Sequence, residues 1–157
     1  MNSLIIFVAR DLYIVIVIAA ILFFLFQSKE LRWKIALCAG VAFPLIYIVA
    51  KIGGFLYYDP RPFVSGQFTP LILHNADNGF PSDHTLFASA FAAVIFFFNR
   101  KFGIVLFILA FLVGIARILA GVHHFVDIFG SLIIAFVVAY VVFEYVMPVV
   151  WKRTGGE

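Results

Sequence analysis

Long apolar runs, separated by short polar or Pro/Gly-rich stretches, dominate the amino-acid sequence. Five such runs cover residues Leu12–Phe26, Ile35–Tyr58, Leu86–Phe98, Phe102–Ala116 and Phe125–Val150. A transmembrane helix needs about 17–25 residues, a length that the third run reaches from Ser82 and the fourth by continuing toward Val122. The runs do not alternate apolar and polar residues as barrel strands do, so the pattern predicts membrane-spanning helices.

Residues 2–10, NSLIIFVAR, form a shorter apolar segment, which is predicted to be an interfacial helix leading into the first span. No small-residue cleavage site follows a compact apolar region, which argues against a removable signal peptide. The final KRTGGE is expected to be a solvated end. Together these features predict an all-α integral membrane protein, a bundle of about five transmembrane helices in a single domain over residues 1–157.

The composition supports a lipid environment. Hydrophobic residues make up 65% of the chain, charged residues make up 12%, and the mean hydropathy is +1.14. A soluble domain is only about half apolar, so lipid must cover much of this surface. The net charge of +3 is spread over short loops and forms no basic stripe, which argues against a nucleic-acid partner. The single cysteine, Cys38, lies in an apolar run and is expected to fill the core.

The positions of lysine and arginine predict the orientation of the chain. If the first span begins outside the cell, seven of the eleven basic residues lie inside: Lys29, Arg32, Lys34, Arg100, Lys101, Lys152 and Arg153. The positive-inside rule then favours an outer N-terminus and an inner C-terminus in the plasma membrane. In this arrangement loop 59–80 and turn 117–125 face outward and share one membrane surface.

Turn 117–125 and the residues that follow it carry an unusual group of polar side chains, in the stretch RILAGVHHFVD. Ionisable groups near membrane depth are costly, so a functional role is favoured over a structural polar network between helices. His123 and Asp127 are four residues apart, which brings them to one helical face, where the carboxylate can hold one ring nitrogen. The other nitrogen is then free to act as a nucleophile or base. A pair between His124 and Asp127 is also possible, so spacing favours His123 without excluding His124.

The stretch NGFPSDHT carries a second group of polar residues. Ser82 or Asp83 is expected to cap the helix that begins there. Unpaired backbone N–H groups and the partial positive charge at such a helix start suit a phosphate. His84, in the first turn, is in a position to exchange a proton with a bound anion.

A third group lies in KIGGFLYYDPRPF. Arg61 stands between two prolines and can grip two phosphate oxygens through its forked guanidinium. Lys51 lies about three turns deeper on the preceding helix and is expected either to assist phosphate binding or to snorkel to the outer surface.

These three motifs, within about residues 40–140, resemble the type-2 phosphatidic acid phosphatase superfamily of membrane lipid phosphatases. The family signature is lysine, six residues, Arg-Pro; then Pro-Ser-Gly-His; then Ser-Arg, five residues, His, three residues, Asp. The matching positions here are Arg61-Pro62, Pro81 to His84, and Ala116 to Asp127. Within the superfamily, PRPF followed by HNADNGFPSDHT looks most like the bacterial undecaprenyl-diphosphatase branch.

Three positions depart from the family signature. Gly54 occupies the place of the motif lysine, and Lys51 lies one helical turn earlier. Asp83 replaces the motif glycine, which puts a carboxylate beside the phosphate and requires a basic partner. Ala116 replaces the motif serine and removes one hydroxyl donor.

The resemblance implies a mechanism that also agrees with the chemistry of the residues. His123 is the expected nucleophile and forms a phosphohistidine, which Asp127 stabilises, while His84 protonates the leaving oxygen and then activates water. The phosphate oxygens are expected to be held by Arg61, Arg117, Lys51 and the amides near Ser82 and Asp83. Neither a metal nor a cofactor is expected. His74 and His124 are interpreted as interface or satisfied polar residues, and Asp77 as support for a loop turn.

The resemblance also implies a substrate: undecaprenyl diphosphate, hydrolysed to undecaprenyl phosphate and phosphate in cell-wall biogenesis. Phosphatidic acid and phosphatidylglycerophosphate are the alternatives, and the sequence makes no prediction of oligomeric state. A small transporter would line several helices with polar residues along their length, whereas here they gather at one end. A zinc hydrolase built on His84, His123, His124 and Asp127 would be expected to carry paired histidines four residues apart, and these are missing.

Overall fold

The computed structural model describes residues 2–153, so most of the expected solvated end, residues 154–157, lies outside the described range. Within that range the chain is helical and forms no strand; Pro60 and Asn78 make one isolated bridge. The helices are α1 (Asn2–Arg10), α2 (Leu12–Leu25), α3 (Lys29–Leu56), α4 (Pro62–Ser65), α5 (Asp83–Phe98), α6 (Arg100–Leu119), α7 (Phe125–Val141) and α8 (Met147–Arg153), with a π-helical turn (Val142–Val146) before α8.

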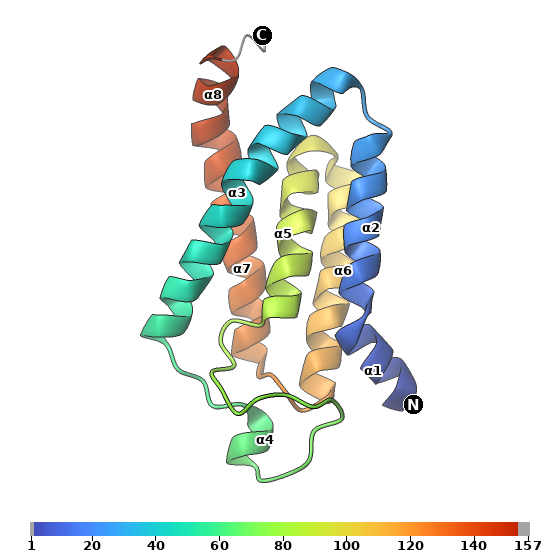
Figure 1. Cartoon of the computed structure of the whole chain (residues 1–157), viewed down its shortest axis with the longest axis vertical. Coiled ribbons are helices and arrows are strands. Elements are labelled where there is room, and N and C mark those ends of the chain that lie inside the picture. The colour runs from blue at the N-terminus through green and yellow to red at the C-terminus, as the bar shows by residue number, and fades with distance from the viewer. Residues whose placement is uncertain (1, 154–157) are drawn as a thin grey trace.

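The long helices form a bundle around α5 (Figure 1). Helix α5 packs against α2, α3, α6 and α7. It does so because its inward positions carry small side chains that let neighbouring backbones approach closely: Ala88, Ser89, Ala92 and Ala93 are all fully buried. The expected helix starting near Ser82 is therefore confirmed, and it lies at the centre of the bundle.

The outer surface of the bundle is apolar, as a lipid environment requires. Large exposed hydrophobic side chains include Ile18, Phe55, Ile108, Ile133 and Val137. By length and hydropathy, α3, α6 and the continuous helix Phe125–Lys152 can each cross a membrane. Helices α1 and α2 pass the same test together, with a bend of 45° between them. The structure thus gives three or four candidate spans, and α5, at 16 residues, is a shorter apolar helix.

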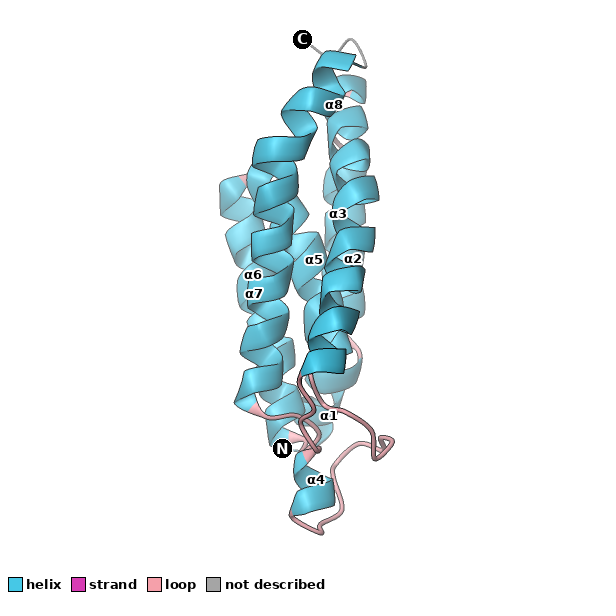
Figure 2. Ribbon diagram, turned by 90° about the vertical axis from the view of Figure 1, so that its left-hand side faces the viewer, coloured by secondary structure: helices cyan, strands magenta, loops and turns pink. Residues whose placement is uncertain are grey.

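The segments that carry the sequence motifs meet at one end of the bundle. Loop 57–82, with α4 inside it, lies beside the turn between α6 and α7, and α1 lies at the same end (Figures 1 and 2). Arg61 donates a hydrogen bond to the carbonyl of Val122, and the amide of Leu71 donates to the carbonyl of Ala120 at 3.0 Å. The prediction that these two segments share one surface is confirmed.

Two smaller expectations concern α1 and Cys38. A short helix over residues 2–10 is confirmed, and it packs against α6 near the motif-bearing end. Cys38 is fully buried in the apolar cluster between α3, α5 and α7, as its position in an apolar run predicts.

Candidate active site

His123 lies in the turn between α6 and α7, where it is almost completely buried. Gly121 adopts a φ of 79°, a left-handed conformation that suits glycine, and so turns the chain after α6. The Nδ1 atom of His123 lies 3.0 Å from Oδ2 of Asp127, and the same oxygen accepts the backbone N–H of His124 at 2.9 Å. The predicted pairing of His123 with Asp127 is confirmed.

The local geometry of this pair differs from the one predicted. The sequence argument placed both residues on one helical face, but α7 begins at Phe125 and His124 occupies its N-cap position. Asp127, in the first turn of α7, reaches back to the two residues that precede the helix. The side chain of His124 turns away toward Asp59, where its Nδ1 lies 2.9 Å from Oδ2.

Arg61 is buried beside His123 and makes hydrogen bonds in several directions. Its Nη1 lies 3.2 Å from Nε2 of His123 and donates to the carbonyl of Val122 at 3.0 Å. Its Nη2 donates to the carbonyl of Asn78 at 3.3 Å, and its Nε to Oδ1 of Asp77 at 2.7 Å. These contacts fix the guanidinium against Nε2 of His123, the ring nitrogen that does not contact Asp127.

The surroundings of His123 keep its imidazole uncharged. Burial lowers the pKa of His123 far below its usual range, and the positive charges of Arg117 and Arg61 lower it further. With Asp127 accepting the proton on Nδ1, the lone pair lies on Nε2, the nitrogen that faces Arg61. The geometry thus presents the form of histidine that a nucleophile requires.

Arg117, near the end of α6, supplies a second buried guanidinium. Its Nη1 donates to the carbonyl of Ala9 in α1 at 3.2 Å. Its Nε is buried and finds no acceptor within residues 2–153. Buried donors are nearly always paired in folded proteins, so this N–H is available to an anionic ligand.

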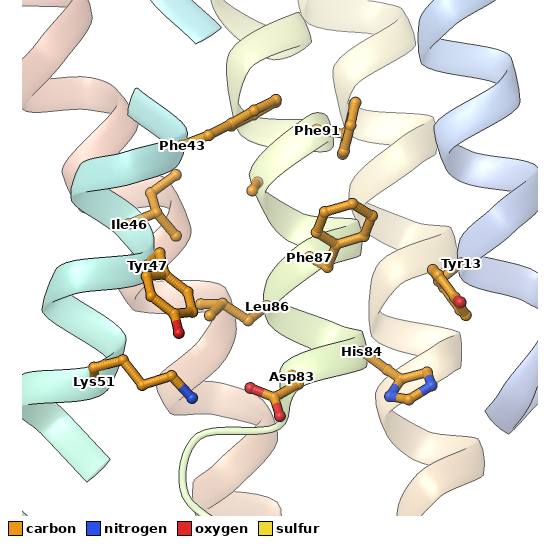
Figure 3. A pocket seen from close by; sticks show the side chains of 11 residues that line it. Tyr13, Phe43, Ile46, Tyr47, Lys51, Asp83, His84, Leu86, Phe87 and Phe91 are labelled. Carbon is orange, nitrogen blue, oxygen red and sulfur yellow. The ribbon is translucent and has the colours of Figure 1, made fainter. Parts of the chain in front are cut away.

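His84, Asp83 and Lys51 line a pocket of about 460 Å³ between α2, α3 and α5 (Figure 3). The ring of His84 packs edge-on against Tyr13, with the ring centroids 4.9 Å apart. Figure 3 shows the ammonium of Lys51 pointing toward the carboxylate of Asp83. The ammonium of Lys51 also lies over the ring of Tyr47, 5.2 Å from its centroid.

The structure also explains why the motif lysine is absent at position 54. A Cβ atom at Gly54 would lie 2.9 Å from the backbone oxygen of Phe80, which is closer than side chains tolerate. Asn78 keeps the motif loop close to α3, because its Nδ2 donates to the carbonyl of Gly54 at 2.7 Å. A lysine at this position would therefore push the motif loop away from α3.

Ser82 occupies the N-cap position of α5, but the prediction that its side chain, or that of Asp83, caps the helix is wrong, since neither makes a capping hydrogen bond. The Ser82 hydroxyl instead accepts a hydrogen bond from Thr85 at 3.1 Å. Its backbone N–H donates to the carbonyl of Asp127 at 3.4 Å, and its carbonyl accepts from Ser131 at 3.0 Å. Ser82 therefore fastens the start of α5, which carries Asp83 and His84, to the start of α7.

His74 and Asp77 belong to the site although sequence reasoning placed them outside it. The ring of His74 stands edge-on to His123, with the centroids 6.0 Å apart. Burial, with the charges of Arg61 and Arg117, lowers the pKa of His74. Burial alone would raise the pKa of Asp77, but the hydrogen bond and charge of Arg61 outweigh it and lower the pKa.

Asp59 and Asn78 are two further loop residues that the sequence did not identify. The Asn78 side chain accepts the amides of Asp59 at 2.9 Å and Phe80 at 3.0 Å, and also donates to the carbonyl of Tyr57. The only signal for Asn78 in the sequence was composition, because residues 74–78, HNADN, are five polar or small residues in a predominantly apolar chain.

Sequence comparison finds relatives across most of the chain. A model of the PAP2 superfamily matches residues 33–151. The chain is 33% identical over 145 residues to the undecaprenyl-diphosphatase BcrC of Bacillus subtilis, covering 92% of this chain and 75% of that protein. It is 32% identical to a protein of Bacillus licheniformis named bacitracin transport permease protein BcrC, covering 91% and 70%. It is 33% identical to the putative undecaprenyl-diphosphatase YbjG of Escherichia coli, covering 85% and 67%.

Two solved structures share the fold. Aquifex aeolicus LpxE matches with a TM-score of 0.70 and 24% identity, over 92% of this chain and 88% of that one. The PAP2-type phosphatidylglycerolphosphate phosphatase of Bacillus subtilis matches with a TM-score of 0.60 and 21% identity, over 94% and 77%. The family match covers the helices and loops that position His123, His84 and Arg61. This chain therefore belongs to the PAP2 superfamily.

Proposed function

We propose that this protein is a lipid phosphatase that releases the terminal phosphate of undecaprenyl diphosphate through a phosphohistidine on His123. One observation carries the proposal: a buried imidazole whose Nδ1 is held by Asp127 and whose Nε2 faces Arg61. Two of the relatives are named as undecaprenyl-diphosphatases, one of them putatively, which supports the choice of substrate.

The first chemical step forms the phosphohistidine. Nε2 of His123 attacks the terminal phosphorus in line, and the bond from phosphorus to the bridging oxygen breaks. The electron pair leaves with the lipid phosphate, whose oxygen takes a proton from His84. The guanidiniums of Arg61 and Arg117 hold the equatorial oxygens, where negative charge spreads in the transition state. Asp127 stabilises the positive charge that develops on the imidazole.

The second step releases phosphate. His84, now neutral, removes a proton from water, and the water oxygen attacks phosphorus from the side that the lipid has left. The N–P bond breaks, its electron pair returns to Nε2, and inorganic phosphate leaves. In this sequence we assign Lys51 to the phosphate cradle because it lines the same pocket as His84, while the start of α5 offers its first backbone amides.

The pocket beside His84 fits the tail of a lipid substrate. Most of the residues that line it are apolar, among them Phe43, Ile46, Leu86, Phe87 and Phe91 (Figure 3). Because His84 stands at this pocket, a chain leaving the reacting phosphate would pass from the proton donor directly into apolar surroundings. The same pocket would admit the acyl chains of phosphatidic acid or phosphatidylglycerophosphate, so these are the alternative substrates.

Phosphate release by the purified protein in detergent tests the proposal. We expect turnover of undecaprenyl diphosphate at least about tenfold faster, in kcat/KM, than of phosphatidic acid or phosphatidylglycerophosphate, a difference of about 1.4 kcal/mol in transition-state binding. We also expect that EDTA does not lower the rate. Faster release from one of the two phospholipids would identify that phospholipid, rather than undecaprenyl diphosphate, as the preferred substrate. Loss of activity in EDTA would favour a zinc hydrolase, and no release from any of the three would favour a transport function.

We further propose that α2, α3, α5, α6 and α7 form five spans of the plasma membrane, with the active site facing outward. The end of the bundle opposite the site holds the α2–α3 and α5–α6 connections and α8 (Figure 1). These segments carry the basic residues that the positive-inside rule places in the cytoplasm. At this end, near the start of α3, Lys34 pairs with Glu30 at 2.8 Å.

Thiol labelling of intact cells tests this orientation. Single cysteines at Leu73, which is 97% exposed, and at Lys101 are introduced in a Cys38→Ala background. A membrane-impermeant reagent is expected to label the Leu73→Cys variant in intact cells, and the Lys101→Cys variant only after permeabilisation. The reverse pattern would place the active site in the cytoplasm.

A further inference from the structure

A second histidine–carboxylate pair lies directly beside His123 and Asp127, and the phosphatase mechanism does not use it. The Nδ1 atom of His124 lies 2.9 Å from Oδ2 of Asp59, a residue of the link between α3 and α4. His124, Asp59 and Asp127 each offer one donor atom, and the three atoms all lie within 4.8 Å of one another. The loop from α3 and the start of α7 thus bring together three side chains able to hold a metal ion.

Asp127 leaves one acceptor in this cluster unused. Its side chain is 0% exposed, and its Oδ2 accepts hydrogen bonds from His123 and from the His124 amide. Its Oδ1 is also buried, and no group within residues 2–153 donates a hydrogen bond to it. Buried carboxylate oxygens normally have a partner. The Asp59 carboxylate lies close enough to interact with that of Asp127. Two adjacent carboxylates repel each other unless a shared proton or a cation lies between them, and a cation there would also satisfy Oδ1.

The donor set indicates which cation fits. Zn²⁺ accepts both imidazole nitrogen and carboxylate oxygen as ligands, whereas Ca²⁺ and Mg²⁺ prefer oxygen alone. Ligand atoms around a tetrahedral zinc ion lie roughly 3.3–3.6 Å apart, so donor atoms that lie within 4.8 Å of one another need to close by at most about 1.5 Å. The His124 side chain is 41% exposed and that of Asp59 is 13% exposed, so an ion can enter from solvent. The positive charge of the nearby Arg61 would repel a cation, but the ion pair between Arg61 and Asp77 already balances the charge of Arg61.

We propose that Asp59, His124 and Asp127 form an inhibitory zinc site, with water at the fourth position. A zinc ion on Asp127 withdraws the negative charge that would stabilise the imidazolium of His123, so phosphoenzyme formation slows. His123 itself is not a ligand, because its Nδ1 donates to Oδ2 of Asp127 and its Nε2 faces Arg61. The inhibition rests on the proposed phosphatase activity, whereas the binding of zinc does not.

Zinc binding is measured first, without substrate, by competition between the purified protein and a colorimetric zinc indicator. The wild type is expected to bind one equivalent, and His124→Phe and Asp59→Asn to bind it at least about tenfold more weakly. His74→Phe and His123→Ala are the matched controls, since they remove site histidines outside the cluster, and both are expected to bind as the wild type does. Size-exclusion chromatography confirms folding, and Asp59→Asn keeps the test valid if His124→Phe fails to fold.

Phosphate release is then measured with added zinc. The wild type is expected to be inhibited in kcat and restored by EDTA, while His124→Phe stays active at the same zinc concentration. Unchanged zinc affinity in His124→Phe and Asp59→Asn, or loss of binding in His123→Ala, would overturn the proposed site. Zinc binding by a protein that hydrolyses none of the lipids would instead refute the proposed function and leave the metal site standing.

Discussion

Replacement of His123 by alanine is expected to abolish phosphate release, on the order of 10⁴-fold or more, together with any trapped phosphoenzyme. The reason is that Nε2 of His123 is the atom that would bond to phosphorus. His124 is also held by a carboxylate, but His123 is the histidine whose Nε2 lies beside the guanidinium of Arg61. His124→Phe is expected to keep substantial activity, because the His124 ring points to Asp59 rather than to the guanidinium of Arg61. Phosphate release and acid-labile phosphoenzyme are measured for both variants in detergent.

The two histidine variants control for each other, since they alter neighbouring positions in the same turn. Both are checked for folding by size-exclusion chromatography before their activities are compared. An inactive His124→Phe together with an active His123→Ala would show that the nucleophile, and the alignment with the family signature behind it, are wrong.

Asp127→Asn is expected to lower kcat by roughly 10²–10³-fold, within the range associated with charge and proton-transfer partners. The amide oxygen can take the place of Oδ2 and still accept from His123 and from the His124 backbone. The ring orientation is therefore kept, and the variant removes the negative charge alone. Single-turnover measurement of phosphoenzyme formation, with product release excluded, reports this charge effect directly.

Asp127→Ala serves as the comparison because it removes both the charge and the orienting oxygen. We expect it to be more damaging than Asp127→Asn by about tenfold or more, as loss of ring orientation adds to loss of charge. Equal rates in the two variants would indicate that Asp127 does not orient the ring. Wild-type rates in Asp127→Asn would indicate that its charge takes no part in the reaction.

The Arg117–Asp127 stretch illustrates how far sequence reasoning reaches. The spacing of four residues predicted the contact between His123 and Asp127 correctly, because any compact conformation of so short a segment keeps the two side chains near each other. It did not predict the helix boundaries within the stretch: α6 continues to Leu119, and α7 begins only at Phe125. That boundary decides the direction of His124, which faces Asp59 as a result.

The sequence alone determined the apolar helices, the shared surface of the motif-bearing segments, and the membership of the PAP2 superfamily. These features depend on local composition and on spacing within single segments, which the chain carries however it folds. Only the tertiary structure decided which groups support the site. Arg61 meets Asp77 across 16 residues and Val122 across 61, and Arg117 meets Ala9 across 108. Loop residues have no periodicity that reveals such partners, because packing of the helices, rather than local preference, sets how closely distant loops approach.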